Sequence, residues 1–275
     1  MPVLNEELVL DAQLARLTRQ CAHHDCELFI VDGGSSDRTT AVAQCYGWVV
    51  AAPRGRATQM NAGAAVASGE VLIFLHADTI LPDDAFGAIE KALALPQVVG
   101  GAFRICFNCQ HWPYRLVSFT VNVRSHMRKI FTGDQAYFIR SASFKAVGGY
   151  PNQPLMEDLE IITRLRKIGK VVLLPQYVTT SARRHEKIGL IRSVLLMWYL
   201  RTLYKLGTSP EQLQRMYLDG KRGEAKELRS AQCCYHERIV QAGKARTPPR
   251  LIRLPGGDQA SKQEQARALG ELQAP

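Results

Sequence analysis

The feature that most constrains the fold is the regular alternation of two kinds of segment over the first hundred residues. Short apolar runs typical of buried strands occupy residues 27–32, 48–51 and 71–75. Segments with helical spacing of apolar residues, or with helix-start signals, lie between and around them at residues 8–22, 37–46, 57–67 and 82–95. Strands that alternate with helices build a mainly parallel sheet with helices on both faces, so the sequence predicts an α/β fold.

The second half of the chain is less regular. Residues 98–106, 135–139 and 171–174 are predicted to be strands, and residues 156–168 a helix. Residues 189–217 are predicted to be C-terminal helices, with a break at Gly207-Thr-Ser-Pro210. From residue 220 onward Lys, Arg, Gln, Glu, Ala and Gly dominate. We therefore expect one domain over residues 1–219 and a basic, partly disordered tail over residues 220–275.

The formal net charge of +10 suits a phosphorylated ligand, an anionic membrane face or nucleic acid. No nucleic-acid-binding motif is present, so we expect no nucleic-acid partner. No apolar run is long enough to span a membrane, and no signal peptide is visible, so the sequence predicts a cytoplasmic protein. Residues 190–206 are rich in Leu, Trp and Tyr. They allow a weak peripheral contact with the inner membrane face, but a helix docked on the domain is the preferred interpretation.

Polar residues stand where two of the predicted strands end. Asp32 follows one apolar run, and His76 and Asp78 follow another. In an open α/β sheet, ligands bind outside the carboxyl ends of parallel strands, so these side chains are expected at one crevice. If the chain stays extended past Leu75, His76 and Asp78 face the same way. The pair then either holds a divalent metal ion or forms a solvated strand end.

Five motifs occur in a fixed order along the chain. They are Pro2-Val-Leu-Asn-Glu-Glu7, Val31-Asp-Gly-Gly-Ser-Ser-Asp-Arg-Thr39, Arg54-Gly-Arg-Ala-Thr-Gln-Met-Asn-Ala-Gly63, Gly133-Asp-Gln135 and Glu157-Asp158. Together with His76-Ala-Asp78, they resemble the family 2 glycosyltransferases with the GT-A fold over about residues 2–185. The stretches Gly133-Asp-Gln, Leu155-Met-Glu-Asp and Ser181-Ala-Arg-Arg are most similar to a bacterial subgroup associated with arsenosugar biosynthesis.

The resemblance implies an inverting enzyme that moves a sugar from a nucleotide-diphosphate sugar to an acceptor hydroxyl. Residues 1–100 would form the nucleotide-binding half and residues 101–219 the acceptor half, and the acceptor would be an unknown small molecule or a lipid-linked one. Asp158 matches the general base of the family's ED motif, with Glu157 beside it, and Asp134 and Gln135 would lie near the acceptor. The residues implied in donor binding are Pro2, Asn5, Glu6, Asp32, Arg54, Arg56, Asn61, Ala77, Arg183 and Arg184.

The resemblance also implies a divalent metal cofactor, Mn²⁺ or Mg²⁺. His76-Ala-Asp78 stands at the family's DxD motif, so Asp78 would ligate the metal. His76 departs from the pattern, because the family often has Asp there, and imidazole favours Mn²⁺ over Mg²⁺. Either His76 is a second ligand, or it contacts the diphosphate and leaves Asp78 as the sole ligand. His185 is a candidate further ligand.

Two other functions stay open at this point. A sugar nucleotidyltransferase shares a similar sheet and metal, but it would need a Gly-rich phosphate loop near residue 2. A non-catalytic nucleotide-sugar-binding protein is favoured by His76 in place of Asp. The start of the chain is also unusual, because only Met1 precedes the motif that should follow a buried first strand. Either the native start lies upstream, or the sheet lacks a full first strand and leaves an exposed gap beside residues 27–32.

Overall fold

The computed structural model describes residues 1–109, 111–183 and 189–222. The first sheet contains β1 (Pro2–Val3), β2 (Phe29–Asp32) and β3 (Trp48–Ala51), in that order and all parallel. Successive side chains of β2 point to opposite faces. Ile30 packs with residues of α1 (Glu7–Cys21) and α2 (Thr39–Gln44), whereas Val31 packs with Val66 of α3 (Arg56–Val66). Helices therefore cover both faces, as the sequence predicts.

The first strand is only two residues long, yet it leaves no exposed gap beside β2. The backbone N–H of Val31 donates to Met1 O over 2.8 Å, and that of Gly33 donates to Val3 O over 3.0 Å. Val31 is almost fully buried. The buried Gln59 of α3 donates to both Val3 O and Val31 O, over 2.9 and 2.8 Å. This amide crosslinks β1 to β2, so β1 covers this edge of β2 and the predicted gap is wrong.

The second sheet has the order β4-β7-β6-β8-β5 and is mixed. Its strands are β4 (Val71–Phe74), β7 (Tyr137–Arg140), β6 (Val98–Phe107), β8 (Lys170–Thr180) and β5 (Thr79–Ile80). Only β6 and β8 pair in parallel, and the other pairs of this sheet are antiparallel. One face packs on α4 (Ala85–Leu93), and the other packs on α6 (Ser141–Ala146) and α7 (Glu157–Ile168). The predicted α/β fold with a mainly parallel sheet and helices on both faces is thus confirmed, with the antiparallel pairs confined to the second sheet.

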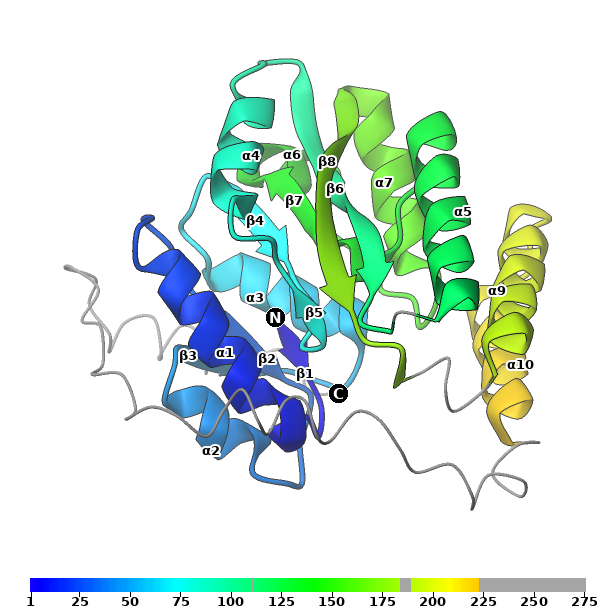
Figure 1. The fold of residues 1–275 in the computed structure, drawn as a ribbon, viewed down its shortest axis with the longest axis horizontal. Helices are drawn as coiled ribbons and strands as arrows, with labels where there is room; N and C mark the ends of the chain where they lie inside the picture. Colours follow the sequence, from blue (N-terminus) through cyan, green and yellow to red (C-terminus); the bar gives the residue numbers. More distant parts are fainter. Residues whose placement is uncertain (110, 184–188, 223–275) are drawn as a thin grey trace.

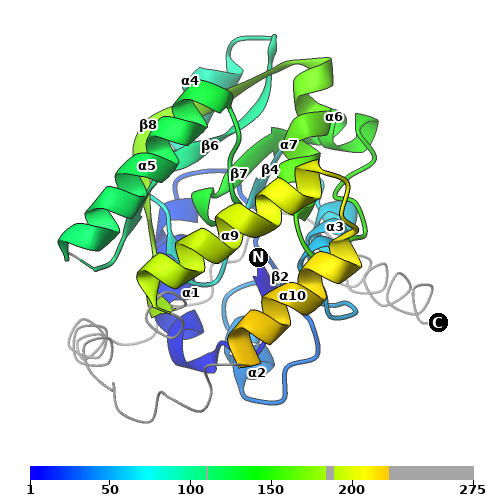
Figure 2. The same cartoon turned by 90° about the vertical axis from the view of Figure 1, so that its right-hand side faces the viewer.

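Three more helices lie beside this framework, on the side that Figure 2 presents: α5 (Trp112–Arg128), α9 (Leu190–Lys205) and α10 (Pro210–Arg222). Leu200 of α9 and Leu213 of α10 pack against Leu155 and Leu159 at the start of α7, so α9 is docked on the domain by one side. Among the described residues, no helix is both long and apolar enough to cross a bilayer. Apart from residues 220–222 in α10, the predicted tail lies outside the described residues.

Candidate active site

The chain turns at the end of β4 and separates the two residues of the His76-Ala-Asp78 motif. Strand β4 ends at Phe74, and the backbone N–H of Thr79 donates to His76 O over 3.1 Å. The extended geometry assumed from the sequence therefore stops before His76. The side chain of Ala77 is buried in the core between β1 and α1, and the two polar side chains flanking it meet different partners. The motif thus contributes to two neighbouring groups of residues.

The first group joins Asp78, Glu6 and Arg183. The guanidinium of Arg183 lies 3.1 Å from Glu6 Oε2 and 3.2 Å from Asp78 Oδ2. Burial lowers the pKa of Arg183, but the two carboxylates outweigh it and keep that pKa above its ordinary value. Burial raises the pKa of Glu6, and Arg183 opposes this only in part. A cation from the end of β8 is thereby held against two acids from the ends of β1 and β4.

The second group lies around the 3₁₀ turn of Gly133–Gln135, which carries Asp134. His76 Nδ1 lies 3.3 Å from Asp134 Oδ1, and the His76 side chain is largely buried. The backbone N–H of Gly133 donates to Asp158 Oδ2 over 3.1 Å. A Cβ on Gly133 would stand 2.9 Å from the His76 ring, so a glycine is required for this close approach. Asp134, His76 and Asp158 are therefore brought together by one short turn.

Asp158 is held at the N-terminus of α7. Its Oδ1 accepts from the backbone N–H of Leu159 over 2.8 Å, as suits a carboxylate at a helix start. The neighbouring Glu157 is buried, and its Oε1 lies 3.0 Å from Arg56 Nε. Burial raises the pKa of Glu157, and the charge of Asp158 adds to this, while Arg56 opposes it. Arg56, predicted to bind the donor, thus pairs with the base motif in this structure.

Two tyrosines complete the walls beside Asp158. Tyr137 and Tyr150 line a narrow gap together with His76, Gly133, Glu157 and Asp158. Burial raises the pKa of both tyrosines well above the ordinary value, and the nearby Asp158 adds to the effect. The Tyr150 hydroxyl is buried without a hydrogen-bond partner among the described residues. Asp78 is not among the residues that line this gap, and its carboxylate contacts Arg183 instead.

The predicted donor residues near the N-terminus lie on two interlocked loops. The Asp32 carboxylate accepts from the backbone N–H groups of Gly34 and Ser35, over 3.1 and 3.0 Å. Asn5 has a positive φ of 54° and accepts from the Ser36 N–H over 2.8 Å. Pro2 is part of β1. The carboxyl ends of β1 and β2 therefore form a fixed floor beside Glu6.

Other predicted site residues have their polar groups engaged inside the fold. Gln135 is fully buried, and its amide donates to Phe103 O and accepts from Thr132 and Ser125. The side-chain amide of Asn61 donates to Tyr150 O over 2.8 Å and accepts from the Tyr150 N–H over 2.9 Å. These two side chains position Asp134 and Tyr150 in this structure. Arg54 is exposed on the loop before α3.

Arg184 and His185 lie outside the described residues. Within residues 1–109, 111–183 and 189–222, no three His, Cys, Asp or Glu side chains converge as a metal cluster. The described contacts of the Asp78 carboxylate engage its Oδ2 alone, and the side chain is partly exposed. Mg²⁺ is commonly held by one or two carboxylates together with substrate phosphates. Asp78 fits that kind of site, in which most ligands come from the donor and water.

Backbone strain marks the same region and is not evident from the sequence. Within the part of the chain that the structure describes, four residues other than glycine have a positive φ: Asn5, Lys129, Ala136 and Met156. Asn5 precedes Glu6, Ala136 follows the turn that carries Asp134, and Met156 precedes Glu157-Asp158. Such conformations cost about 1–3 kcal/mol each and cluster at functional sites. Three separate segments that carry candidate site residues are therefore held in strained geometry.

One family model and several solved structures are similar to this chain. The family model described as glycosyl transferase family 2 matches residues 1–147, more than half of the 275 residues. No curated protein matches the chain. Among solved structures, the mannosyltransferase PcManGT from Pyrobaculum calidifontis, in complex with GDP-Man and Mn²⁺, superposes with a TM-score of 0.59 at 17% identity, over 100% of this chain and 79% of that one. TarS residues 1–349 from S. aureus superposes with a TM-score of 0.52 at 17% identity, over 71% of this chain and 64% of that one.

The two superpositions establish a shared GT-A fold. Because sequence identity is only 17% in both, they establish the fold alone. The match over residues 1–147 spans the nucleotide-side motifs, the His76-Ala-Asp78 turn and the turn that carries Asp134. The chain therefore belongs to glycosyl transferase family 2, and it is a glycosyltransferase.

Proposed function

We propose that the protein is an inverting, metal-dependent glycosyltransferase that moves a sugar from a nucleotide-diphosphate sugar to an acceptor hydroxyl. One observation carries the proposal: Asp158 and Asp134 meet at the Gly133 turn together with His76, and the same short segment carries Asp78 into the Glu6–Arg183 group. His76 connects the two sides, because it leaves the strand that leads to Asp78 and contacts Asp134. This link supports a proposed base and a proposed leaving-group site at one active site, as a direct displacement requires.

Asp158 is the proposed general base. Its two oxygens are oriented by backbone N–H groups of Gly133 and Leu159, which leaves lone pairs for an acceptor hydroxyl. A fixed carboxylate that removes the hydroxyl proton contributes about 10²–10⁴-fold to rate. A single displacement assisted by one base inverts the anomeric centre. Asp134 is the proposed acceptor contact, and Gln135 holds it from within the core.

The donor is proposed to lie over the carboxyl ends of β1, β2 and β4, against Asn5, Glu6, Asp32 and Asp78. Arg183 supplies positive charge at the diphosphate, and the exposed Arg54 and the predicted Arg184 stay candidates for the same role. A divalent ion at Asp78 would stabilise charge on the leaving diphosphate. The complex of PcManGT with Mn²⁺ and GDP-Man supports a metal and a nucleotide-sugar donor in this fold. His185 stays a predicted further ligand.

The test measures release of nucleoside diphosphate from a panel of UDP- and GDP-sugars, with Mn²⁺ present. Asp158→Asn should lower the rate by about 10²–10⁴-fold while the donor still raises the melting temperature. Glu160→Gln is the matched control, because Glu160 lies on the same helix but pairs with Arg164, and it should keep full activity. Full activity of Asp158→Asn would show that the base is assigned wrongly.

The same assay separates the alternatives. A non-catalytic binding protein would show donor-induced stabilisation and no product from any donor. A sugar nucleotidyltransferase would release no nucleoside diphosphate from these donors, but would release pyrophosphate when a nucleoside triphosphate and a sugar 1-phosphate are supplied instead. The family match supports sugar transfer. The narrower resemblance to the arsenosugar subgroup stays a prediction about the acceptor.

A further inference from the structure

Helices α5 and α9 expose an unusual amount of apolar surface. Five large apolar residues of α5 and four of α9 are exposed to solvent. We call this set the α5–α9 face: Trp112, Leu116, Phe119, Val123, Met127, Ile191, Leu195, Trp198 and Tyr199. Trp112 is 74% exposed, Met127 76% and Ile191 75%. Steps of three or four residues place the α5 members along one stripe of the helix, as in an amphipathic helix.

The burial pattern of α5 is inverted relative to a helix that packs on a core. Its buried residues are Ser118 and Ser125, whereas its apolar stripe is exposed. Asn122 attaches the serine side of α5 to β6: its side-chain amide accepts from the Ile105 N–H and donates to Ile105 O, each over 2.9 Å. Helix α9 is apolar on both sides: Leu200 is buried against α7, and Leu195 and Trp198 face solvent. Contiguous exposed apolar area of this kind marks an interaction surface.

The charge on both helices has a single sign. Neither α5 nor α9 contains Asp or Glu, while Arg115, Arg128, Arg192 and Lys205 are exposed on them. The helices run side by side in both ribbon views (Figures 1 and 2). Burial and the nearby charge of Arg201 on α9 lower the pKa of Arg124 on α5 to about 10.

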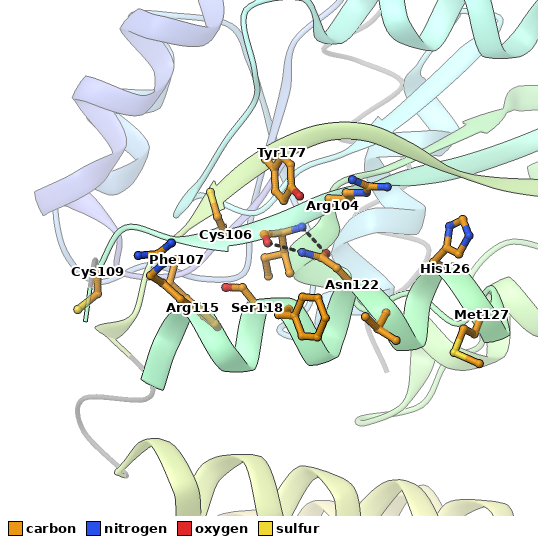
Figure 3. Close-up of a pocket in the computed structure, with 13 residues that line it drawn as sticks. Arg104, Cys106, Phe107, Cys109, Arg115, Ser118, Asn122, His126, Met127 and Tyr177 are labelled. Atoms are coloured by element: carbon orange, nitrogen blue, oxygen red, sulfur yellow. Dashed lines mark hydrogen bonds between the residues drawn. The ribbon is translucent and has the colours of Figure 1, made fainter. Parts of the chain in front are cut away.

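A groove continues the face between α5 and the second sheet. It has a volume of about 580 Å³ and is lined by apolar Phe119, Val123 and Met127 together with Arg104, Arg115 and His126. In Figure 3, His126 projects from the α5 ribbon, and Arg104 lies across the groove on the side of the sheet. Arg104 also lies over the ring of Tyr177, 5.8 Å from its centroid. The groove combines apolar walls with cations, as an amphiphile with an anionic head requires.

We propose that the α5–α9 face docks on an anionic lipid bilayer. Three partners could cover this face: a second copy of the chain, residues 223–275 of the same chain, or a membrane. Charge complementarity distinguishes them. A second copy of this chain would bring like-charged arginines together, and residues 223–275 carry nine Lys or Arg against six Asp or Glu. An anionic membrane complements the cations, each worth about 1 kcal/mol near such a surface, and it accepts the apolar side chains. The two tryptophans and Tyr199 suit the bilayer interface, where amphipathic rings are enriched.

The test uses the full chain and vesicles of two compositions, phosphatidylcholine alone and phosphatidylcholine with phosphatidylglycerol. The protein should co-sediment with the anionic vesicles at low salt and be released at high salt, because screening removes the charge attraction. Trp112→Ser/Trp198→Ser should lose most of this binding, and Arg115→Gln/Arg192→Gln should lose its salt-sensitive part. Leu8→Ser is the matched control, because Leu8 is 78% exposed on α1, and it should bind as the unchanged protein does.

The variants change exposed side chains, so their melting temperatures should match that of the parent, and transferase activity toward a soluble donor should be retained. Equal vesicle binding by parent and Trp112→Ser/Trp198→Ser would overturn the proposal and assign binding to another segment. Failure of the parent to bind anionic vesicles would also overturn it. A concentration-dependent dimer that the same double variant abolishes would identify a second copy as the occupant instead.

Discussion

Arg56 of α3 and Glu157 of α7 form an ion pair in which Arg56 Nε lies 3.0 Å from Glu157 Oε1, and the Glu157 side chain is only 3% exposed. The pair joins a nucleotide-side helix to the residue next to the proposed base. The other oxygen of Glu157 is buried and has no hydrogen-bond partner among the described residues. The charge of Glu157 therefore depends strongly on Arg56, and the position of Asp158 depends on both.

Replacing Arg56 with Met should destabilise the fold in a pH-dependent way. The loss of a charged hydrogen bond to a buried group costs about 1.5–3 kcal/mol. Burial already raises the pKa of Glu157, and removal of Arg56 raises it further. A raised carboxyl pKa means that stability is highest below the unfolded pKa and falls as pH rises through the folded pKa. Urea unfolding should therefore show a larger loss at pH 8 than at pH 5.

Glu157→Gln provides the control for that experiment. In the double variant with Arg56→Met, no buried carboxylate is left to titrate, so the extra loss at pH 8 should disappear. An equal destabilisation by Arg56→Met at both pH values would show that the pair contributes packing and no charge compensation.

Gly133→Ala should damage catalysis with little effect on stability. The added Cβ would stand 2.9 Å from the Cε1 and 3.1 Å from the Nε2 of His76, so the ring must shift and its contact with Asp134 is disturbed. Misplacement of about 1 Å can cost 10²-fold in rate. Gly87→Ala is the matched control, because nothing lies within 4 Å of its added Cβ in α4. That variant should gain about 0.5–1 kcal/mol in helix stability and keep full activity. Steady-state rates and urea unfolding of both variants test this prediction. Equal activities of Gly133→Ala and Gly87→Ala would contradict it.

His76→Phe should separate the acceptor side of the site from the metal side. The change removes Nδ1, which lies 3.3 Å from Asp134, but keeps a ring of similar shape. We expect a higher KM for the acceptor, or a lower rate of donor hydrolysis where no acceptor is known. The Mn²⁺ concentration for half-maximal activity should stay unchanged. A large rise in that concentration would instead make His76 a metal ligand.

The sequence predicts what depends on local pattern. Strand β3 was predicted with its observed bounds, and α1, α3 and α7 within one residue at each end, because their apolar spacing and strand order are local features. Helix α5 was not predicted. Its apolar residues face solvent and its buried residues are Ser118 and Ser125, so the pattern lacks an ordinary core face.

In the candidate site, too, the residues in local motifs were predicted and the long-range contacts were not. The resemblance implies that Asp158, with Glu157 beside it, is the base and that Asp134 lies near the acceptor, and in the structure Asp158 and Asp134 come together through the Gly133 turn. The link between Arg56 and Glu157 spans 101 positions of the sequence, and no local pattern encodes it. The turn after β4 likewise depends on its pairing with distant β8, since Thr79 is paired with Thr180. Long-range geometry therefore decides which of two neighbouring motif residues faces which group.

Asp78→Asn should remove the enhancement of donor binding by Mn²⁺. Arg183→Gln should weaken donor binding both with and without Mn²⁺. The amide keeps the shape of Asp78 but loses the charge that a hard divalent ion prefers. Addition of Mn²⁺ should therefore enhance the donor-induced melting shift in the parent and fail to do so in Asp78→Asn. In Arg183→Gln, the shift should shrink with and without Mn²⁺, because the cation at the diphosphate is lost while Asp78 keeps its charge. Thermal shift with UDP and GDP, with Mn²⁺ or EDTA, distinguishes the two variants without any turnover. An unchanged Mn²⁺ enhancement in Asp78→Asn would remove Asp78 from the metal site.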